Sequence, residues 1–326
     1  MRKKSLIWVF ITVLLANVAT LALAQHNTMI RKLDYLNDEL TVVGMNGFPP
    51  FSDYRQKNNN ILLQSAFIKP LNEAIVGRSM RLNMQEFTIY DKQDINNLAL
   101  AVQIGKYNIY IGAYADTKRF KNLTLIYPAV ISNPIHVITL PEKSEKIKDV
   151  ESLKKLRGVV VDSEFYNDFS SRKIEELNVK HVENPLVAYE LLFTEQIDYI
   201  IGGLYYHRIM ASRQGLDSFL SYSKKPLFKI PVFLALSKST PKFAMYLKAF
   251  QEAFSQPEFV KSVKEEILRM IEEELAANEG IVPPSFANAQ RMEVETKGED
   301  TEKAPVQLET DNKSNAQQFE EILEGL

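Results

Sequence analysis

The segment Tyr107–Pro128, YNIYIGAYADTKRFKNLTLIYP, organises the rest of the chain. It opens with Ile109–Ile111, a run that predicts a short buried strand, continues through the small residues Gly112 and Ala113, and then enters a polar loop that carries Arg119. Open α/β sheets place ligand sites where a strand ends in a loop. A guanidinium can hold a carboxylate through two charge-assisted hydrogen bonds, so Arg119 is a candidate for binding an anionic group.

Composition limits the function classes that the chain can belong to. The 326 residues are 45% hydrophobic and 25% charged, which is typical of a globular protein, and this length predicts two domain-sized units. The net charge of -2 and the pI of about 6.2 do not indicate a nucleic-acid partner, which would need a clearly basic face. Cysteine is absent, which excludes disulfides, thiol nucleophiles and thiolate metal sites.

The N-terminus predicts a signal peptide at residues 1–24. A basic start, Met1–Lys4, precedes the apolar run Leu6–Ala24, and small residues stand just before Gln25. The alternative is a retained membrane anchor, because the apolar run is nearly long enough to cross a bilayer. No cysteine follows the cleavage site, so a lipoprotein anchor is excluded. We expect an exported protein with no cofactor.

Predicted strands and helices alternate along the chain, which indicates an α/β fold with largely parallel sheets. The strand Leu40–Gly44 is followed by Asn46–Phe51, in which two prolines exclude helix and present Phe48 and Phe51 at the strand's end. Ile61–Ile75 is predicted to be a helix because apolar residues recur every four positions. After Glu279 the polar composition predicts disorder.

Four segments, in this order and spacing, resemble the type 2 periplasmic solute-binding proteins of family 3, best known as amino-acid receptors of ABC transporters. The first resembles that family's opening strand and aromatic-proline turn, the second its helix, strand and ligand loop, the third the start of its second lobe, and the fourth a helix-strand unit near the end of that lobe. In chain order they are VVGMNGFPPF (Val42–Phe51), LALAVQIGKYNIYIGAYADTKR (Leu98–Arg119), SLKKLRGVVV (Ser152–Val161) and LVAYELLFTEQIDYIIG (Leu186–Gly202).

The resemblance implies a two-lobe, type II periplasmic-binding-protein fold, with mixed sheets flanked by helices and two crossing strands as a hinge. Lobe one would comprise residues 25–129 plus 229–279, lobe two residues 130–228, and residues 280–326 a disordered polar tail. The crossings would lie near Tyr127–Pro134 and Lys224–Pro231. It also implies a periplasmic monomer that works with a membrane transporter permease.

The resemblance assigns roles to single residues. Arg119 matches the position that pairs with the ligand's carboxylate; the alternative is a solvated loop arginine between Lys118 and Lys121. Phe48 matches the aromatic residue that stacks on the solute, with Phe51 inside the lobe; the alternative is that both rings belong to the core.

Gly112, Ala113 and Tyr114 stand where the family uses backbone amides and a serine hydroxyl, so Tyr114 is expected to supply its own hydroxyl. Two positions depart from the family pattern. Asp116 replaces the usual threonine, and its charge would repel an anionic ligand or pair with Arg119. Gly203 stands where relatives that bind α-amino acids commonly carry an aspartate for the ammonium group.

Glu164 or Asp162 could hold a cationic group at the start of lobe two, although helix capping by Asp162 or Ser163 is the plainer interpretation. Asp198 is read as structural. No metal or catalytic site is predicted, because the histidines show no ligand spacing and no local triad signature accompanies them. The four histidines are His26, His136, His181 and His207.

Three functions remain open at this stage. The first is a protein that captures a small polar solute, an amino acid or related carboxylate, between two lobes by hinge closure and delivers it to an ABC-type transporter. The second is a cyclohexadienyl or arogenate dehydratase-like enzyme on the same scaffold, with Glu164 or Asp116 as general acid. The third is a sensory or interaction module with a degenerate cleft.

Overall fold

The computed structural model describes residues 39–57, 60–76, 81–83, 95–115, 123–147, 149–162, 164, 168–177 and 179–287. The predicted signal peptide, Asp116, Arg119 and the chain after residue 287 lie outside these residues. Among the described helices, none combines the length and apolar character needed to cross a bilayer.

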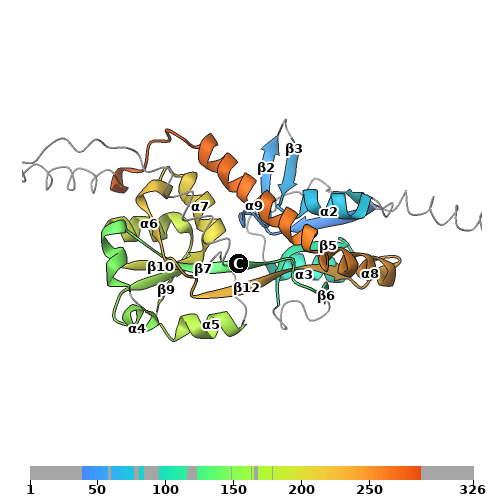
Figure 1. The fold of residues 1–326 in the computed structure, drawn as a ribbon, viewed down its shortest axis with the longest axis horizontal. Helices are drawn as coiled ribbons and strands as arrows, with labels where there is room; N and C mark the ends of the chain where they lie inside the picture. The colour runs from blue at the N-terminus through green and yellow to red at the C-terminus, as the bar shows by residue number, and fades with distance from the viewer. Residues whose placement is uncertain are drawn as a thin grey trace, which may run out of the picture.

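The described elements form two lobes that lie side by side (Figure 1). Lobe one contains β1 (Glu39–Gly44), β2 (Asp53–Lys57), β3 (Asn60–Gln64), α2 (Ile68–Val76), β4 (Arg81–Asn83), α3 (Ile95–Gln103), β5 (Ile109–Tyr114), β6 (Leu123–Leu125) and α8 (Phe243–Phe254). Lobe two contains η1 (Pro141–Lys146), α4 (Val150–Leu153), β8 (Gly158–Val161), α5 (Asp168–Glu175), β9 (Lys180–Val182), α6 (Pro185–Phe193), β10 (Tyr199–Gly203), α7 (Leu204–Ser212), η2 (Asp217–Phe219) and β11 (Ser221–Tyr222).

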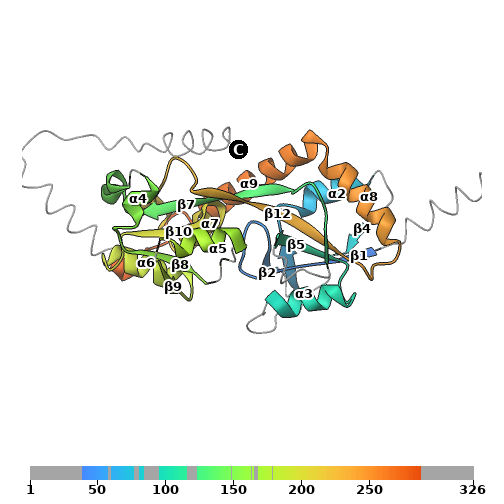
Figure 2. The ribbon, with the colours of Figure 1, turned by 90° about the horizontal axis from the view of Figure 1, so that it is seen from below.

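Two long strands, β7 (Ile131–Thr139) and β12 (Phe228–Ser237), cross between the lobes (Figure 2). They pair with each other, antiparallel, over residues 131–135 and 228–232. Beyond that stretch β7 pairs with β10 of lobe two, and β12 pairs with β5 of lobe one. Ten of the described strands therefore form one mixed sheet in the order β4-β1-β5-β12-β7-β10-β8-β9, with β6 beside β12 and β11 beside β7, and β2 and β3 form a separate two-stranded sheet. The predicted α/β fold with two crossing strands is confirmed.

The main hydrophobic core runs through both lobes, and a second cluster lies within lobe two. Buried β-branched runs such as Val159–Val161 and Ile200–Ile201 supply the strands β8 and β10 of lobe two, as expected for strands covered on both faces. The parallel pairings β1 with β4 and β5, and β8 with β9 and β10, place the carboxyl ends of both lobes' strands at the junction.

The predicted helix over Ile61–Ile75 is wrong in its first part. Residues Asn60–Gln64 form β3, which pairs with β2 in a hairpin that stands out from lobe one (Figure 1). Leu63 lies opposite Tyr54, and both side chains are buried. A short apolar run fits either a strand or a helix, so the periodicity of Phe67 and Leu71 identified only the helix α2 that follows.

The chain also returns to lobe two after its last long helix. The helix α9 (Pro257–Ala277) begins beside α8 and passes over the junction towards lobe two (Figure 1). The segment that follows packs on lobe two: Ala287 is 1% exposed and the ring of Phe286 lies 5.7 Å from that of Phe193. The tail was expected to be disordered from residue 280, whereas residues 281–287 are held by this apolar contact. The rest of the tail lies outside the described residues.

We predict that His136 on β7 makes stability depend on pH. Burial lowers the pKa of His136 to about 4, although Nδ1 lies 2.7 Å from the carbonyl oxygen of Ser223. Since the unfolded chain takes up a proton below about pH 6.5 and the folded chain does not until about pH 4, stability falls as the pH drops through this window. Between neutral pH and about pH 5 the loss is about 2 kcal/mol from this group.

Urea unfolding of the parent and of His136→Gln at the two pH values isolates this contribution. The variant should lose about 2 kcal/mol less than the parent. His181→Gln, at an exposed histidine that pairs with Asp162, is the matched control and should follow the parent. Equal pH dependence in the parent and His136→Gln would contradict the prediction.

Candidate functional site

A bulge at Gly112 directs the end of β5 towards the lobe junction. Ile111 pairs with Leu234 and Ala113 with Phe233, so Gly112 is an extra residue that its partner strand does not match. Its φ of 81° is in the left-handed region that glycine adopts without strain. A Cβ at this position would lie 3.5 Å from Phe51 Cβ and 3.9 Å from Phe48 Cδ1. The bulge therefore sits directly against the aromatic turn that follows β1.

Aromatic side chains from the two lobes meet at this point. The ring of Phe48 lies 5.9 Å from that of Tyr114 and 6.1 Å from that of Tyr206, which is on α7 of lobe two. Phe51 makes the neighbouring contact, 6.0 Å from the ring of Tyr205. All five side chains are buried, and such aromatic pairs contribute about 0.5–1.5 kcal/mol each beyond their buried area.

Lobe two contributes a buried carboxylate, Glu164. Its Oε2 accepts the backbone N–H of Gly203 at 2.6 Å, and its Oε1 lies 2.6 Å from Nε2 of His207. The other ring nitrogen of His207 lies 2.9 Å from the hydroxyl of Tyr189. Glu164 is 4% exposed and His207 is fully buried, so each supplies one of the other's buried polar contacts. The sequence did not single out His207 for this role.

Two glycines at the end of β10 make room for this arrangement. A Cβ on Gly202 would lie 2.1 Å from Nε2 of His207, and a Cβ on Gly203 would lie 2.8 Å from Nδ2 of Asn133 and 3.1 Å from Oε2 of Glu164. Side chains from three separate elements therefore converge on the start of α7. This explains in physical terms why Gly203 can stand here, because Glu164 and Asn133 already fill the space beside it.

Asn133, on the crossing strand β7, links the two lobes' polar groups. Its Nδ2 donates to the hydroxyl of Tyr114 at 2.8 Å, while its Oδ1 is buried and has no hydrogen-bond partner among the described residues. Burial raises the pKa of the Tyr114 hydroxyl; the hydrogen bond from Asn133 opposes this, and the charge of Glu164 adds to it. Tyr114 is therefore a neutral donor and acceptor at neutral pH.

The structure brings five of the seven predicted ligand residues to the junction. Gly112, Ala113 and Tyr114 lie at the end of β5, Phe48 beside them, and Glu164 across from them on lobe two. Arg119 and Asp116 lie outside the described residues, so their roles stay predictions. Phe48 does face lobe two, but at 2% exposure it packs against the protein's own tyrosines instead of an open cleft.

Sequence reasoning missed Asn133 and Tyr206. Both stand in apolar runs that read as core, and only their contacts with Tyr114 and Phe48 of lobe one mark them. Asp198 has the structural role expected of it, accepting the backbone N–H and the guanidinium of Arg157. Glu164 is one of the two candidates for a general acid, and both of its carboxylate oxygens are engaged with Gly203 and His207. Among the described residues, no group of three histidine or acidic side chains is arranged to hold a metal ion.

A pocket of about 440 Å³ lies between the β2–β3 hairpin, α2 and α9. Its charged lining is engaged in ion pairs: Arg269 binds Glu266 and Glu273, Lys69 lies 3.8 Å from Glu266, and Arg55 pairs with Glu274. We place the candidate site at the junction instead, because polar groups from both lobes converge there and one of them, Asn133 Oδ1, lacks a partner among the described residues.

The fold is that of amino-acid-binding proteins with two lobes. The GluR0 ligand-binding core in complex with L-glutamate matches with a TM-score of 0.54 and 16% identity, over 72% of this chain and 97% of its own. A putative binding component of an ABC transporter from Wolinella succinogenes, complexed with lysine, gives the same TM-score and identity over 72% and 95%. An ancestral amino-acid-binding protein described as a precursor of cyclohexadienyl dehydratase gives 0.51 and 16%, over 71% and 94%.

No family model matches the sequence. No curated protein matches it either. The structural likeness therefore identifies the fold, and the residues of the junction must carry the functional argument.

We predict that Glu164→Ala lowers the free energy of unfolding by about 3 kcal/mol, because it leaves the buried His207 and the Gly203 N–H without their acceptor. Glu164→Gln should lose less, since its amide keeps one oxygen. Urea unfolding measures both. Asp162→Ala removes a carboxylate from an exposed pair with His181 and should change stability by less than about 0.5 kcal/mol. A loss at Glu164→Ala no larger than that control would contradict the prediction.

Proposed function

We propose that the chain is an exported solute-binding protein that captures a small polar solute, an amino acid or related carboxylate, at the lobe junction. One observation carries the proposal. Phe48 and Tyr114 of lobe one, Asn133 of a crossing strand, and Glu164 of lobe two meet at the end of β5. A group assembled from both lobes and the strands between them is complete only when the lobes are together, which is the requirement for binding by closure.

The chemistry at this point suits a zwitterionic or carboxylate solute. Arg119 follows β5 by five positions and is proposed to bind the carboxylate, a contact worth about 1.5–3 kcal/mol. Phe48 offers an apolar face, and Tyr114, Asn133 and Glu164 offer hydroxyl, amide and carboxylate groups for the polar end. In the structure the rings of Phe48 and Tyr206 touch, so entry of a solute requires the lobes to separate and this contact to open.

The delivery step extends the same proposal. The basic and apolar N-terminus supports export to the periplasm, and the amino-acid-binding proteins of the same fold support an ABC-type transporter permease as the membrane partner. The protein would act as a monomer, with no cofactor.

A thermal-shift screen of the mature protein against amino acids, dicarboxylates and polyamines should identify a ligand that raises the melting temperature. Binding at a hundredfold excess over the dissociation constant stabilises the protein by about 2.7 kcal/mol.

We predict that Arg119→Ala abolishes micromolar binding in calorimetry, because removing one partner of a buried charge pair costs about 2–5 kcal/mol. Lys118→Ala, the adjacent cation, is the matched control and should bind as the parent does. Unchanged affinity in Arg119→Ala would remove this residue from the site.

A second candidate is a sensory or interaction module whose cleft is filled by its own side chains. The observation that favours it is the burial of Phe48 and Phe51 by Tyr206 and Tyr205. In that case no solute in the screen would raise the melting temperature, and deletion of residues 288–326 would remove a co-purifying partner. Under the solute-binding proposal, the same deletion leaves the thermal shift intact.

A further inference from the structure

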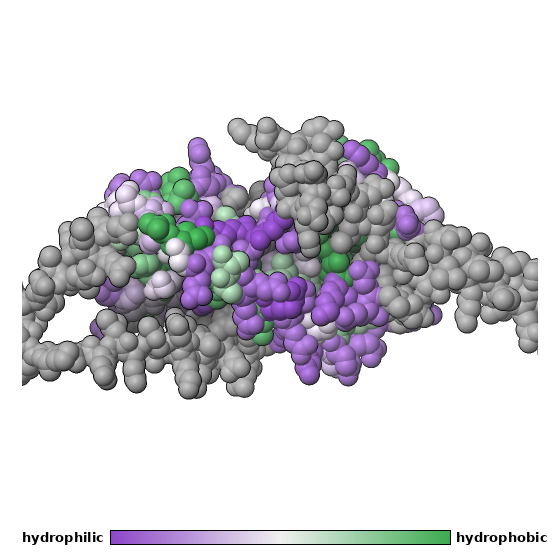
Figure 3. Space-filling view, turned by 90° about the horizontal axis from the view of Figure 1, so that it is seen from above, coloured by the Kyte–Doolittle hydropathy of each residue, from purple (hydrophilic) through white to green (hydrophobic). Residues whose placement is uncertain are grey.

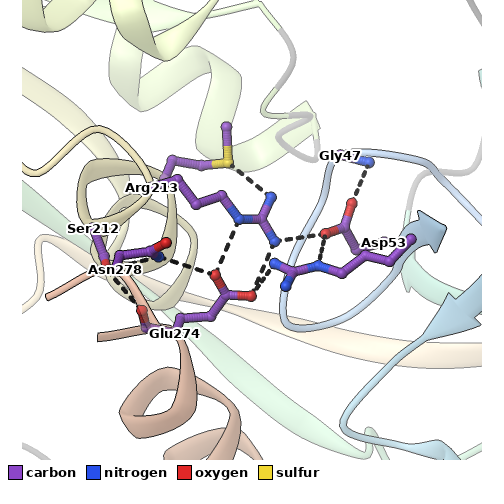
Figure 4. A network of polar contacts seen from close by, with 8 residues as sticks. Gly47, Asp53, Ser212, Arg213, Glu274 and Asn278 are labelled. Atoms are coloured by element: carbon purple, nitrogen blue, oxygen red, sulfur yellow. Dashed lines mark hydrogen bonds and ion pairs between the residues drawn. The ribbon is translucent and has the colours of Figure 1, made fainter. Parts of the chain in front are cut away.

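Arg213, which follows the last residue of α7, is held by two carboxylates, Asp53 of lobe one and Glu274 near the C-terminal end of α9, the helix that passes over the junction (Figure 4). Its Nη2 donates to Oδ2 of Asp53 on β2 at 2.7 Å. Its Nε and Nη2 lie 3.3 and 3.4 Å from the two oxygens of Glu274 on α9. A two-pronged contact of a guanidinium with a carboxylate is directional and holds its partners in one arrangement.

This contact is partly shielded from solvent. The side chains of Asp53 and Glu274 are 7% and 11% exposed, and that of Arg213 is 23% exposed. Screening by water and salt is correspondingly weaker than at a surface ion pair. Neighbouring hydrogen bonds extend the same joint: Ser212 Oγ donates to the carbonyl oxygen of Glu274, and Asn278 Nδ2 donates to Ser212 Oγ, both at 3.2 Å.

Arg55 offers the same two carboxylates a second cation, so Arg213 can separate from them without leaving them unpaired. Arg55 lies on lobe one and pairs with the same two carboxylates, Asp53 at 3.4 Å and Glu274. When Arg213 leaves, Asp53 and Glu274 therefore keep a cation, and Asp53 also keeps the N–H of Gly47 at 3.2 Å. Burial lowers the pKa of Arg55, and the nearby charge of Arg213 lowers it further.

The same face of lobe two carries further contacts with lobe one. Tyr205 and Tyr206, on α7 with Arg213, pack on Phe51 and Phe48. Above them α9 runs from lobe one over the junction, and the backbone of Ile281, beyond its end, packs against Gly215. The middle of the face seen from above is mostly hydrophilic (Figure 3).

We propose that Arg213 is an inter-lobe latch, and that α9 with residues 281–287 forms a strap over it, so that the closed arrangement prevails with no solute bound. Opening exposes Arg213 to water and leaves Asp53 and Glu274 paired with Arg55. This inference concerns the equilibrium between closed and open lobes and does not depend on the proposed function.

The absence of cysteine allows a direct test with the full-length mature protein. Lys248→Cys on α8 and Glu190→Cys on α6 place one exposed label on each lobe, for distance measurement by pulsed electron paramagnetic resonance. The labelled parent should show one narrow, short distance. Adding Arg213→Ala should produce a second, longer distance, with the ratio of open to closed molecules raised about tenfold or more.

Two further variants make the result interpretable. Arg157→Ala breaks an ion pair with Asp198 that lies wholly within lobe two, so it should leave the parent distance unchanged. Asp53→Asn weakens the latch from lobe one and should shift the ratio in the same direction as Arg213→Ala, but less, because Glu274 still holds Arg213. A parent that already populates the long distance overturns the proposal. A folded Arg213→Ala protein whose distance distribution matches that of Arg157→Ala also overturns the proposal. If Arg213→Ala fails to fold, the distance distribution of Asp53→Asn decides in the same way.

Discussion

The antiparallel pairing of β7 with β12 is the constraint on which the rest of the structure depends. Five residues of each strand are paired in register, and beyond them each strand enters a different lobe. The pairing fixes the position of Asn133, opposite Ile230, at the centre of the junction. It also fixes which strand ends face this residue, so that Tyr114 at the end of β5 and Gly203 at the end of β10 both lie beside Asn133. A candidate site then arises from elements that are far apart in the sequence.

The alternation of strands and helices was sufficient to predict the fold class, because buried runs such as Gly158–Val161 and Tyr199–Gly203 have no other stable setting. The start of α6 shows how local sequence sets a helix boundary: Asn184 accepts the N–H of Val187, and Pro185 stands at the first turn. The hairpin of β2 and β3 was not predictable, because its short apolar run fits both the two-residue period of a strand and the 3.6-residue period of a helix. The packing of Leu63 in the hydrophobic core, a tertiary contact, decides between the two.

The candidate site was predictable only on the side where local sequence carries it. Gly112–Tyr114 and Phe48 lie in the two segments around which the interpretation was built, and they do lie together. His207 and Tyr206 could not have been found in this way, since an apolar helix that contains them reads as core until its partner across the junction is known. The latch had no local signal either, because Asp53, Arg213 and Glu274 are separated by 160 and 61 positions along the chain.

The crowding at Gly203 has a consequence for how this surface can change through mutation. Any side chain at position 203 would collide with Asn133 and Glu164, which themselves hold the Tyr114 hydroxyl and the start of α7. An acidic residue fits at position 203 only if Glu164 is first replaced by a residue with a shorter side chain. That replacement alone leaves Nε2 of the buried His207 without its carboxylate partner. The three positions are therefore epistatically coupled, and a lineage exchanging one acidic group for the other must pass through a destabilised intermediate or change both codons together.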